Sequence, residues 1–236
     1  MGGVFSYIKA MGMISHVYIK DGKVVDECSN DWYYYDQNSN DITGVEDPVG
    51  GNNAIHINPA QHFILSDKFT DGNDSNFVSV DFYAKLISLS SYGYWYFYSL
   101  GTKDSGLNSI SFCWYDGYLG TYTVGTGPYD FTVAKILKIP FDELVNKWIH
   151  FRFSMDIANH ICKVELNGKV YGATGITNIT IPNAPFSKYS SYIGTWPNLN
   201  GWGAGYHTNT ATSDFYDFKI YNVDIIKSAK DNMKMY

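Results

Sequence analysis

Residues 77–86 constrain the fold of this chain more than any other segment. They read FVSVDFYAKL, and an apolar residue stands at every second position from Val78 to Leu86. A period of two places successive side chains on opposite faces of an extended backbone. The segment therefore predicts a β-strand with one buried face.

Short runs of β-branched and aromatic residues, separated by Gly, Asn and Asp, recur along the chain and are typical of strands joined by turns. The 236 residues include 21 Tyr, 14 Phe and 6 Trp, and aromatic rings pack well on a pleated sheet. Asp21-Gly22 and Asn167-Gly168 each separate two apolar runs and predict type I′ hairpin turns. Further strands are predicted at residues 94–100, 109–114, 119–124, 134–139, 148–154, 162–166, 169–173, 190–195 and 215–221.

Helical signals are confined to one short turn at residues 140–145 and a weakly helical stretch at residues 224–236. About a dozen strands with no helical crossovers between them predict an all-β, antiparallel sandwich or jelly roll.

Charge and hydropathy exclude several classes of protein. The formal net charge is −6 and Lys and Arg are not clustered, so we expect no nucleic-acid partner. No window of about 18 uninterrupted apolar residues occurs, so we expect no membrane span. Cys28, Cys113 and Cys162 are too few and too scattered for a zinc site or a disulfide framework, and we expect buried free thiols. We find no secretory signal in residues 1–15.

Four motifs follow one another in the second half of the chain: WIHFRFS at 148–154, VELNGK at 164–169, YIG at 192–194 and FYDFKIYN at 215–222. In this order and spacing they resemble the concanavalin A-like lectin/glucanase superfamily, and specifically its laminin-G-like branch. The resemblance implies an antiparallel two-sheet jelly-roll sandwich over residues 51–236, with one short helical turn and a short C-terminal helix. Residues 1–50 are then either N-terminal strands of the sandwich or a separate attachment segment.

The motif residues have structural roles in this interpretation. Trp148 and Phe151 are expected in the core, Asn167 and Gly168 supply the turn, and Asp217 holds a loop. The resemblance therefore indicates a fold and does not by itself indicate a function.

The sequence lacks the signatures of catalysis. Members of this superfamily that cleave β-glucans carry a Glu-x-Asp-x-x-Glu strand, because hydrolysis needs two carboxyl groups about 5 to 9 Å apart. No such strand occurs here, nor does a Gly-x-Ser-x-Gly elbow, a phosphate loop or a paired metal-ligand spacing among the histidines. We therefore expect no catalytic residues, and a glycoside hydrolase is the least favoured alternative.

Calcium is the cofactor that the resemblance implies, since many laminin-G-like modules hold one at the rim of the sandwich. The best candidate ligands are Asp71, Asn73 and Asp74, whose oxygen atoms suit a hard cation. The segment is not an EF-hand loop, because Asn76 stands at its sixth position and Phe82 at its twelfth. A polar turn between strands is the alternative interpretation.

Two segments combine aromatic rings with polar side chains, a composition that suits carbohydrate. Rings stack on the C–H faces of sugars, while amide, carboxylate and imidazole groups bond the hydroxyls. In the glycine-rich segment 195–207 the candidate ligand-binding residues are Trp196, Asn200, Trp202, Tyr206 and His207, and in segment 31–36 they are Trp32 and Tyr34. The alternative is that Trp196 and Trp202 fold back onto the sandwich and that residues 32–35 are a strand.

The sequence thus favours a non-catalytic surface-attachment module that binds a cell-surface glycan. We expect it outside a cell or on a virion surface, displayed on a phage or virus particle. The apolar, methionine-rich residues 1–15 predict a homo-oligomer or a larger virion assembly. The alternative is a structural virion fibre or capsid-decoration protein that uses a lectin-like scaffold without binding glycan.

Overall fold

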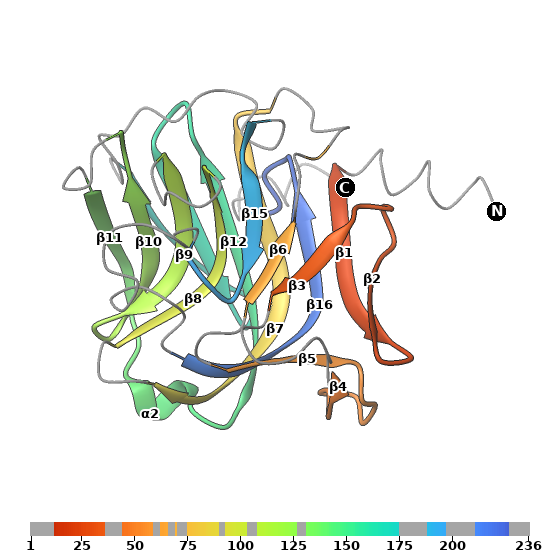
Figure 1. Ribbon diagram of the computed structural model, residues 1–236. Helices are drawn as coiled ribbons and strands as arrows, with labels where there is room; N and C mark the ends of the chain where they lie inside the picture. The colour runs from red at the N-terminus through yellow and green to blue at the C-terminus, as the bar shows by residue number, and fades with distance from the viewer. Residues whose placement is uncertain are drawn as a thin grey trace, which may run out of the picture.

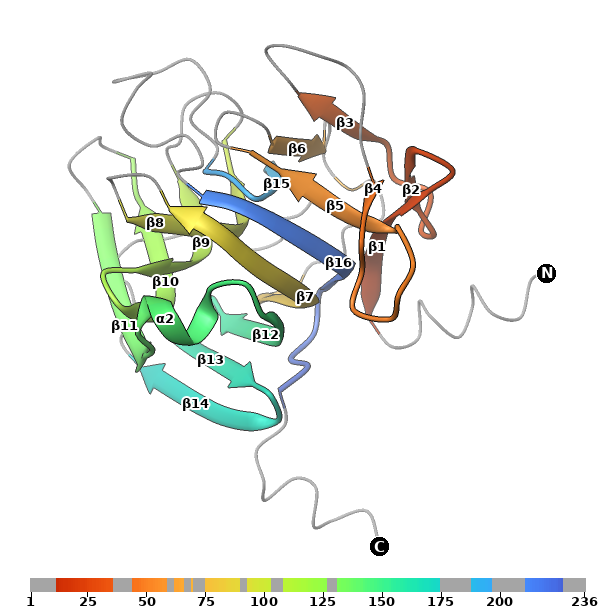
Figure 2. The same cartoon turned by 90° about the horizontal axis from the view of Figure 1, so that it is seen from below.

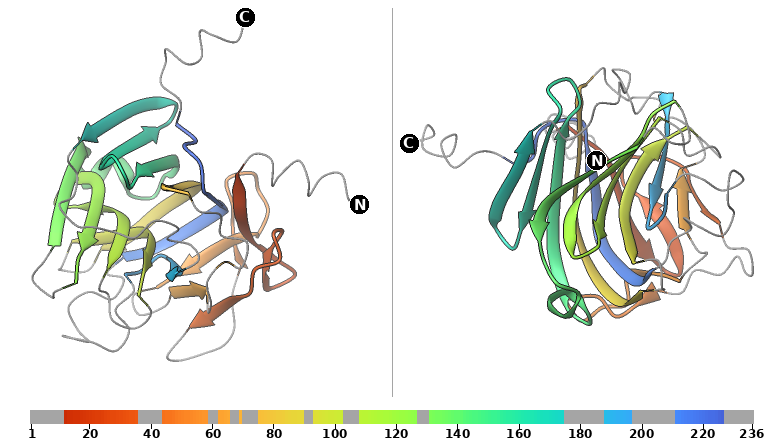
Figure 3. Two further views of the ribbon diagram at one scale, coloured as in Figure 1. Left: turned by 90° about the horizontal axis from the view of Figure 1, so that it is seen from above. Right: turned by 90° about the vertical axis from the view of Figure 1, so that its left-hand side faces the viewer.

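A computed structural model of the protein describes residues 12–35, 44–58, 62–65, 69, 75–89, 93–102, 108–126, 131–174, 188–196 and 211–226. These residues form two curved antiparallel sheets that pack face to face (Figure 1). The two layers are seen nearly edge-on in the right-hand view of Figure 3. The fold is therefore the all-β, two-sheet sandwich that the strand pattern predicts.

The first sheet has nine strands. Its main path runs β14 (Lys169–Thr174), β13 (Ile161–Leu166), β12 (Trp148–Asp156), β7 (Phe77–Leu89), β16 (Ala211–Tyr221), β1 (Met13–Lys20) and β2 (Lys23–Asp26). β5 (Ala54–Ile57) also pairs with β16, and β4 (Gly44–Val45) pairs with β5. The long strands β7 and β16 lie side by side at the centre, although more than a hundred residues separate them in the chain.

The second sheet has seven strands. Their order is β11 (Phe131–Lys138), β10 (Tyr118–Val124), β9 (Ser109–Tyr115), β8 (Tyr94–Gly101), β15 (Ser190–Ile193), β6 (His62–Leu65) and β3 (Trp32–Tyr35). β8 to β11 follow one another through short connections, and β15, β6 and β3 are added from distant parts of the chain.

The predicted alternation in β7 is confirmed, because Val78, Val80, Phe82, Ala84 and Leu86 are all 0% exposed. The predicted turns are confirmed as well. Asp21 and Gly22 have φ angles of 52° and 71°, and Asn167 and Gly168 have 47° and 83°. Positive φ at both central positions is the requirement of a type I′ turn.

Two details differ from the sequence predictions. Trp148 is half-buried on the outer face of the nine-stranded sheet, not in the core, and the Lys85 ammonium lies 5.1 Å from its ring centroid. β15 ends at Ile193, because Gly194 has a φ of 78° and leaves the extended conformation. Asp217 lies inside the predicted strand 215–221, at a bulge of β16, with a φ of 55°.

The segment before residue 51 contributes strands to both sheets. β1 pairs with β16 and β2, and its Val17 and Ile19 are buried in the core. β3 forms one edge of the seven-stranded sheet by pairing with β6. Within the described residues this part of the chain is therefore sandwich, whereas residues 1–11 of the predicted attachment segment lie outside them.

The described residues include one short helix, α2 (Phe141–Leu144), which follows Pro140 and lies at one end of the sandwich (Figure 2). Its Leu144 side chain is buried. After β16 the chain crosses the outer face of the nine-stranded sheet, where Ser79 Oγ donates to the Val223 carbonyl at 2.7 Å and Ser154 Oγ donates to Asp224 Oδ1 at 2.8 Å. Residues 224–226 are not helical, and the remainder of the predicted C-terminal helix lies outside the described residues. Nowhere in the described ranges is there a helix long and apolar enough to cross a membrane.

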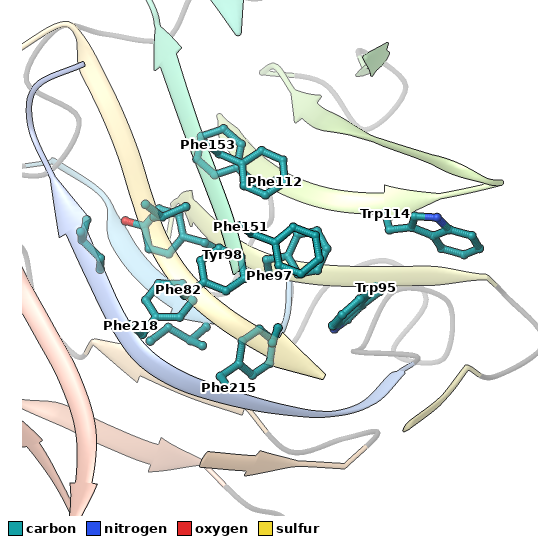
Figure 4. Close-up of a cluster of buried hydrophobic side chains, with 14 of the residues drawn as sticks. Phe82, Trp95, Phe97, Tyr98, Phe112, Trp114, Phe151, Phe153, Phe215 and Phe218 are labelled. Carbon is teal, nitrogen blue, oxygen red and sulfur yellow. The ribbon is translucent and has the colours of Figure 1, made fainter. Parts of the chain in front are cut away.

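The core between the sheets is dominated by phenylalanine rings that converge on Phe82 (Figure 4). The centroid of the Phe82 ring lies 4.7 Å from that of Phe218, 5.5 Å from Phe97, 5.5 Å from Phe151, 6.0 Å from Phe215 and 6.3 Å from Phe153. These residues come from four strands, β7, β12 and β16 of one sheet and β8 of the other, so this cluster joins the two layers.

Candidate functional site

A second aromatic cluster lies on the outer face of the seven-stranded sheet. In β8, Trp95 and Phe97 point into the core, so Tyr94 and Tyr96 point outward. The same alternation in the neighbouring strands places further rings on this side of the sheet. We call this surface the outer aromatic face, made of Tyr94, Tyr96, Tyr115, Tyr118, Tyr122, Phe131 and Trp196.

Trp196 lies at one end of the outer aromatic face, directly after β15. Its indole Nε1 donates to Ser109 Oγ at 3.1 Å, and its ring meets that of Tyr122 edge-on, with centroids 6.0 Å apart. The preceding backbone is also fixed, because the Thr195 carbonyl accepts a 2.7 Å hydrogen bond from Ser99 Oγ. Trp196 is only 7% exposed. Its ring is thus packed against the sheet, as in the alternative in which Trp196 folds back onto the sandwich.

The opposite end of the outer aromatic face is more open. Tyr94 and Tyr115 stack with centroids 4.1 Å apart and rings 12° from parallel, and both are half-buried. Tyr118 faces Tyr115 across the Asp116-Gly117 turn. The Lys135 ammonium lies 4.6 Å from the Tyr118 ring centroid and donates to Asp116 Oδ2 at 2.7 Å. Aromatic rings, a donor and an acceptor therefore lie together at this end.

Three phenols of the outer aromatic face, those of Tyr94, Tyr96 and Tyr122, stay protonated. Burial raises the pKa of Tyr96 and Tyr122. Burial and the neighbouring Tyr115 hydroxyl raise the pKa of Tyr94. These groups are neutral at any physiological pH, and a neutral phenol can both donate and accept a hydrogen bond.

The structure does not bring Trp32 together with Trp196. Trp32 packs against the core side of the sheet, where its ring lies 6.4 Å from that of Phe69 and its Nε1 donates to Asp26 Oδ2 at 2.9 Å. The two tryptophans are therefore on opposite faces of the seven-stranded sheet. Tyr34 lies in β3, as the strand alternative has it.

The remaining candidate residues lie outside the described part of the chain: Asn200, Trp202, Tyr206 and His207, and the metal candidates Asp71, Asn73 and Asp74. Among the residues that are described, no group of three or more His, Cys, Asp or Glu side chains could hold a metal ion. Calcium binding stays a prediction.

The sequence reasoning did not single out Tyr94, Tyr115, Tyr118 or Phe131. A signal was present in the segment YDGY at 115–118, where an Asp-Gly turn places the two flanking tyrosines opposite one another on the same face of a hairpin. Strands with apolar residues on both faces conceal such a surface, because alternation no longer separates the core side from the outer side.

The outer face of the nine-stranded sheet has a different chemistry, since it carries ion pairs across neighbouring strands. Three aspartates each bond one histidine at 2.7 Å: Asp217 to His16, Asp214 to His56 and Asp81 to His150. The same aspartates also pair with Lys219, Lys85 and Arg152, respectively. These contacts join β1, β5, β7, β12 and β16, so we assign this face to the stability of the sheet.

His16 and His56 are expected to make the protein more stable at about pH 6 than at about pH 8.5. Burial opposes protonation of His16, but bonds to Asp217 and Glu27 raise its pKa. The bond to Asp214 raises the pKa of His56. Such a contribution is fully present below the ordinary histidine pKa of about 6.5 and is lost as pH rises through the raised value. Urea unfolding across this range measures the difference.

A His16→Gln, His56→Gln double variant is the control for this prediction, and its stability should change less between the two pH values. The extra stability that the protonated histidines give at acid pH is offset at still lower pH. Burial opposes ionisation of Asp81 and Asp217, but their histidine, arginine and lysine partners hold the pKa of each carboxyl below its ordinary range. Their contribution is lost as pH falls below about 4. A wild-type profile that is flat between pH 6 and pH 8.5 would contradict the prediction.

No protein-family model and no curated protein sequence matches the chain. Solved structures match it in fold. The binding domain of botulinum neurotoxin serotype C1 superposes with a TM-score of 0.62 at 13% identity, over 91% of this chain and 49% of that one. A structure of botulinum neurotoxin type C, whose cell entry is dependent upon interaction with two ganglioside molecules, gives 0.61 at 12% identity, over 96% and 51%.

The receptor-binding domain of botulinum neurotoxin D gives a TM-score of 0.57 at 12% identity, over 94% of this chain and 51% of that one. The chain thus spans about half the length of the structures that it matches. At these identities the likeness shows a shared fold: the sandwich of this protein is one that is also found in receptor-binding domains.

Proposed function

We propose that the protein is a non-catalytic attachment module that binds carbohydrate on a cell surface. The outer aromatic face carries this proposal, because rings lie there beside neutral phenol hydroxyls and a lysine–aspartate pair. Sugars are bound by this combination of flat apolar surface and hydrogen-bonding groups. The fold supports the proposal, since it is shared with domains that bind receptors.

Trp196 has a revised role in this function. Its bonds to the sheet fix the point at which the segment 197–207 begins, next to Tyr122. We assign the direct sugar contacts in that segment to Asn200, Trp202, Tyr206 and His207, which keep the residue types that carbohydrate recognition needs. Trp196 then acts as the anchor of the binding segment.

The ion pairs of three aspartates support a module without catalytic activity. Asp81, Asp214 and Asp217 each share their oxygens between a histidine and a lysine or arginine. A glycosidase needs one carboxyl group that is free to protonate a leaving group and a second that attacks or activates water. Carboxylates held in ion pairs on the outer face of the nine-stranded sheet suit neither task.

Location outside the cell follows from binding a cell-surface glycan. Display on a virus or phage particle, and assembly through residues 1–15, stay predictions. The described part of that segment begins at residue 12, and Met13 and Ser15 are already buried in β1. Assembly through this segment would therefore use residues 1–11.

A glycan array tests the proposed function. Labelled wild-type protein should bind a defined set of glycans, and Trp202→Ala should lower the affinity for them about tenfold or more, as loss of a central aromatic contact does. Tyr216→Ala is the matched control, because this half-buried tyrosine lies on the outer face of the opposite sheet. Wild-type protein that binds no glycan on the array, with or without calcium, would overturn the proposal.

A further inference from the structure

We infer that the outer aromatic face binds an extended oligosaccharide at two separate points, and not a single terminal sugar. This inference rests on the proposed function and adds to it the length of the ligand and a contact site outside segment 197–207. It is carried by the positions of the aromatic rings along β10 and β11.

The first contact point lies where β9 turns into β10. Tyr94, Tyr115 and Tyr118 form a row across three neighbouring strands, each ring half-buried and half-open. Asp116 and Lys135 flank this row, with side chains 66% and 40% exposed. An ammonium group has three N–H donors, and the Asp116 contact uses one of them. Lys135 can therefore donate to a sugar hydroxyl while Asp116 accepts from its neighbour.

The second contact point lies at the other end of the same strands. Phe131 is the first residue of β11 and is 54% exposed. Its ring stacks on that of Tyr122, with centroids 5.9 Å apart and rings 20° from parallel. Tyr122 in turn contacts Trp196, which anchors the segment that holds the other proposed sugar contacts. An exposed aromatic ring that is held flat by a buried one is a preformed stacking surface.

The distance between the two points sets the size of the ligand. Tyr118 and Tyr122 are four residues apart on β10, and so are Phe131 and Lys135 on β11. At about 3.3 Å per residue each pair spans about 13 Å, which is more than one sugar ring covers. On β10 the outward position between the two tyrosines belongs to Gly120, which is buried, and on β11 the outward position between Phe131 and Lys135 belongs to Val133, which is half-buried.

The ligand that fits is a chain of pyranose sugars whose successive C–H faces can lie against the sheet. Its hydroxyl edges reach Lys135 and Asp116 at one end, and its last ring reaches Phe131 at the other. Because the two sites act on one chain, the second contact forms at a high effective concentration, and affinity rises with chain length until both sites are filled.

The test is a glycan array printed with length series, from one to six sugars, of β-linked glucose, N-acetylglucosamine, mannose and galactose. Wild-type protein should bind the longer members of its preferred series about tenfold more tightly than the mono- and disaccharide. Phe131→Ala and Tyr118→Ala should each remove this gain and reduce the binding of long chains to that of short ones. Tyr83→Ala, on the outer face of the opposite sheet, should leave the gain intact.

Phe131 is exposed, so Phe131→Ala is expected to fold. Asp116→Asn is a second variant for the first contact point, because asparagine tolerates the positive φ that this turn requires. Wild-type binding that is equal for one sugar and for six would overturn the extended site and leave the proposed function standing. The extended site would also be overturned if affinity still rose with chain length in the Phe131→Ala, Tyr118→Ala and Asp116→Asn variants. Binding to no glycan of any series would overturn both.

Discussion

Phe82→Ala is expected to lower the free energy of unfolding by about 4 kcal/mol, which is a large part of the stability of a typical domain. Phe82 is 0% exposed, and its ring lies within 6.3 Å of five other phenylalanine rings, measured between centroids. Removing it takes away the apolar burial of a whole ring. It also leaves a cavity that the surrounding strands of two sheets cannot close without moving together.

Urea unfolding followed by tryptophan fluorescence measures this change. Phe131→Ala is the matched control, since it deletes the same atoms from a side chain that is 54% exposed, and it should cost less than about 1 kcal/mol. A loss at Phe82 as small as the loss at Phe131 would mean that the ring cluster does not join the sheets. A change in the slope of the unfolding curve would instead indicate an altered denatured state.

Local features of the fold could be predicted from the sequence because they depend on neighbouring residues. The alternation from Val78 to Leu86 places one face of β7 in the core whatever strand lies beside it. The Asp21-Gly22 and Asn167-Gly168 turns need only residues that tolerate positive φ. Predictions that rest on this kind of information were confirmed.

The candidate site could be predicted only in part, because its geometry depends on distant contacts. Trp196 was selected for its glycine- and asparagine-rich surroundings, yet its ring is covered through Ser109 and Tyr122, which precede it by more than seventy residues. Trp32 is a candidate because tyrosines and aspartates adjoin it in the sequence, and its bond to Asp26 and its contact with Phe69 hold it on the core side of the sheet. Composition indicates that a ring is present, whereas the order of the strands decides which face it occupies.

Asp214→Ala is expected to lower the free energy of unfolding by about 3 kcal/mol, because it removes the shared partner of two cationic side chains. The Asp214 side chain is 3% exposed, and its two oxygens lie 2.7 Å from His56 Nδ1 and 2.8 Å from Lys85 Nζ. These contacts cross from β16 to β5 on one side and to β7 on the other. The expected loss of about 3 kcal/mol is smaller than the largest losses for buried ion pairs. Lys85 and His56 keep about a quarter of their side-chain surface exposed, so water can reach them.

A double variant separates two costs of Asp214→Ala: the lost attraction between Asp214 and its partners, and the cost of leaving the Lys85 ammonium unpaired. Once Asp214 is gone, the Lys85 ammonium is left above the Trp148 ring, at 5.1 Å from its centroid, without its carboxylate. Lys85→Met keeps the length of the side chain and removes the charge, so Asp214→Ala with Lys85→Met should be about 1 kcal/mol or more stable than Asp214→Ala alone. Unfolding in urea at about pH 8 isolates the cost of the unpaired Lys85 charge, because an unpaired histidine is neutral at that pH. If Asp214→Ala costs less than about 1 kcal/mol, or if adding Lys85→Met lowers stability further, the pair contributes by packing and not by charge.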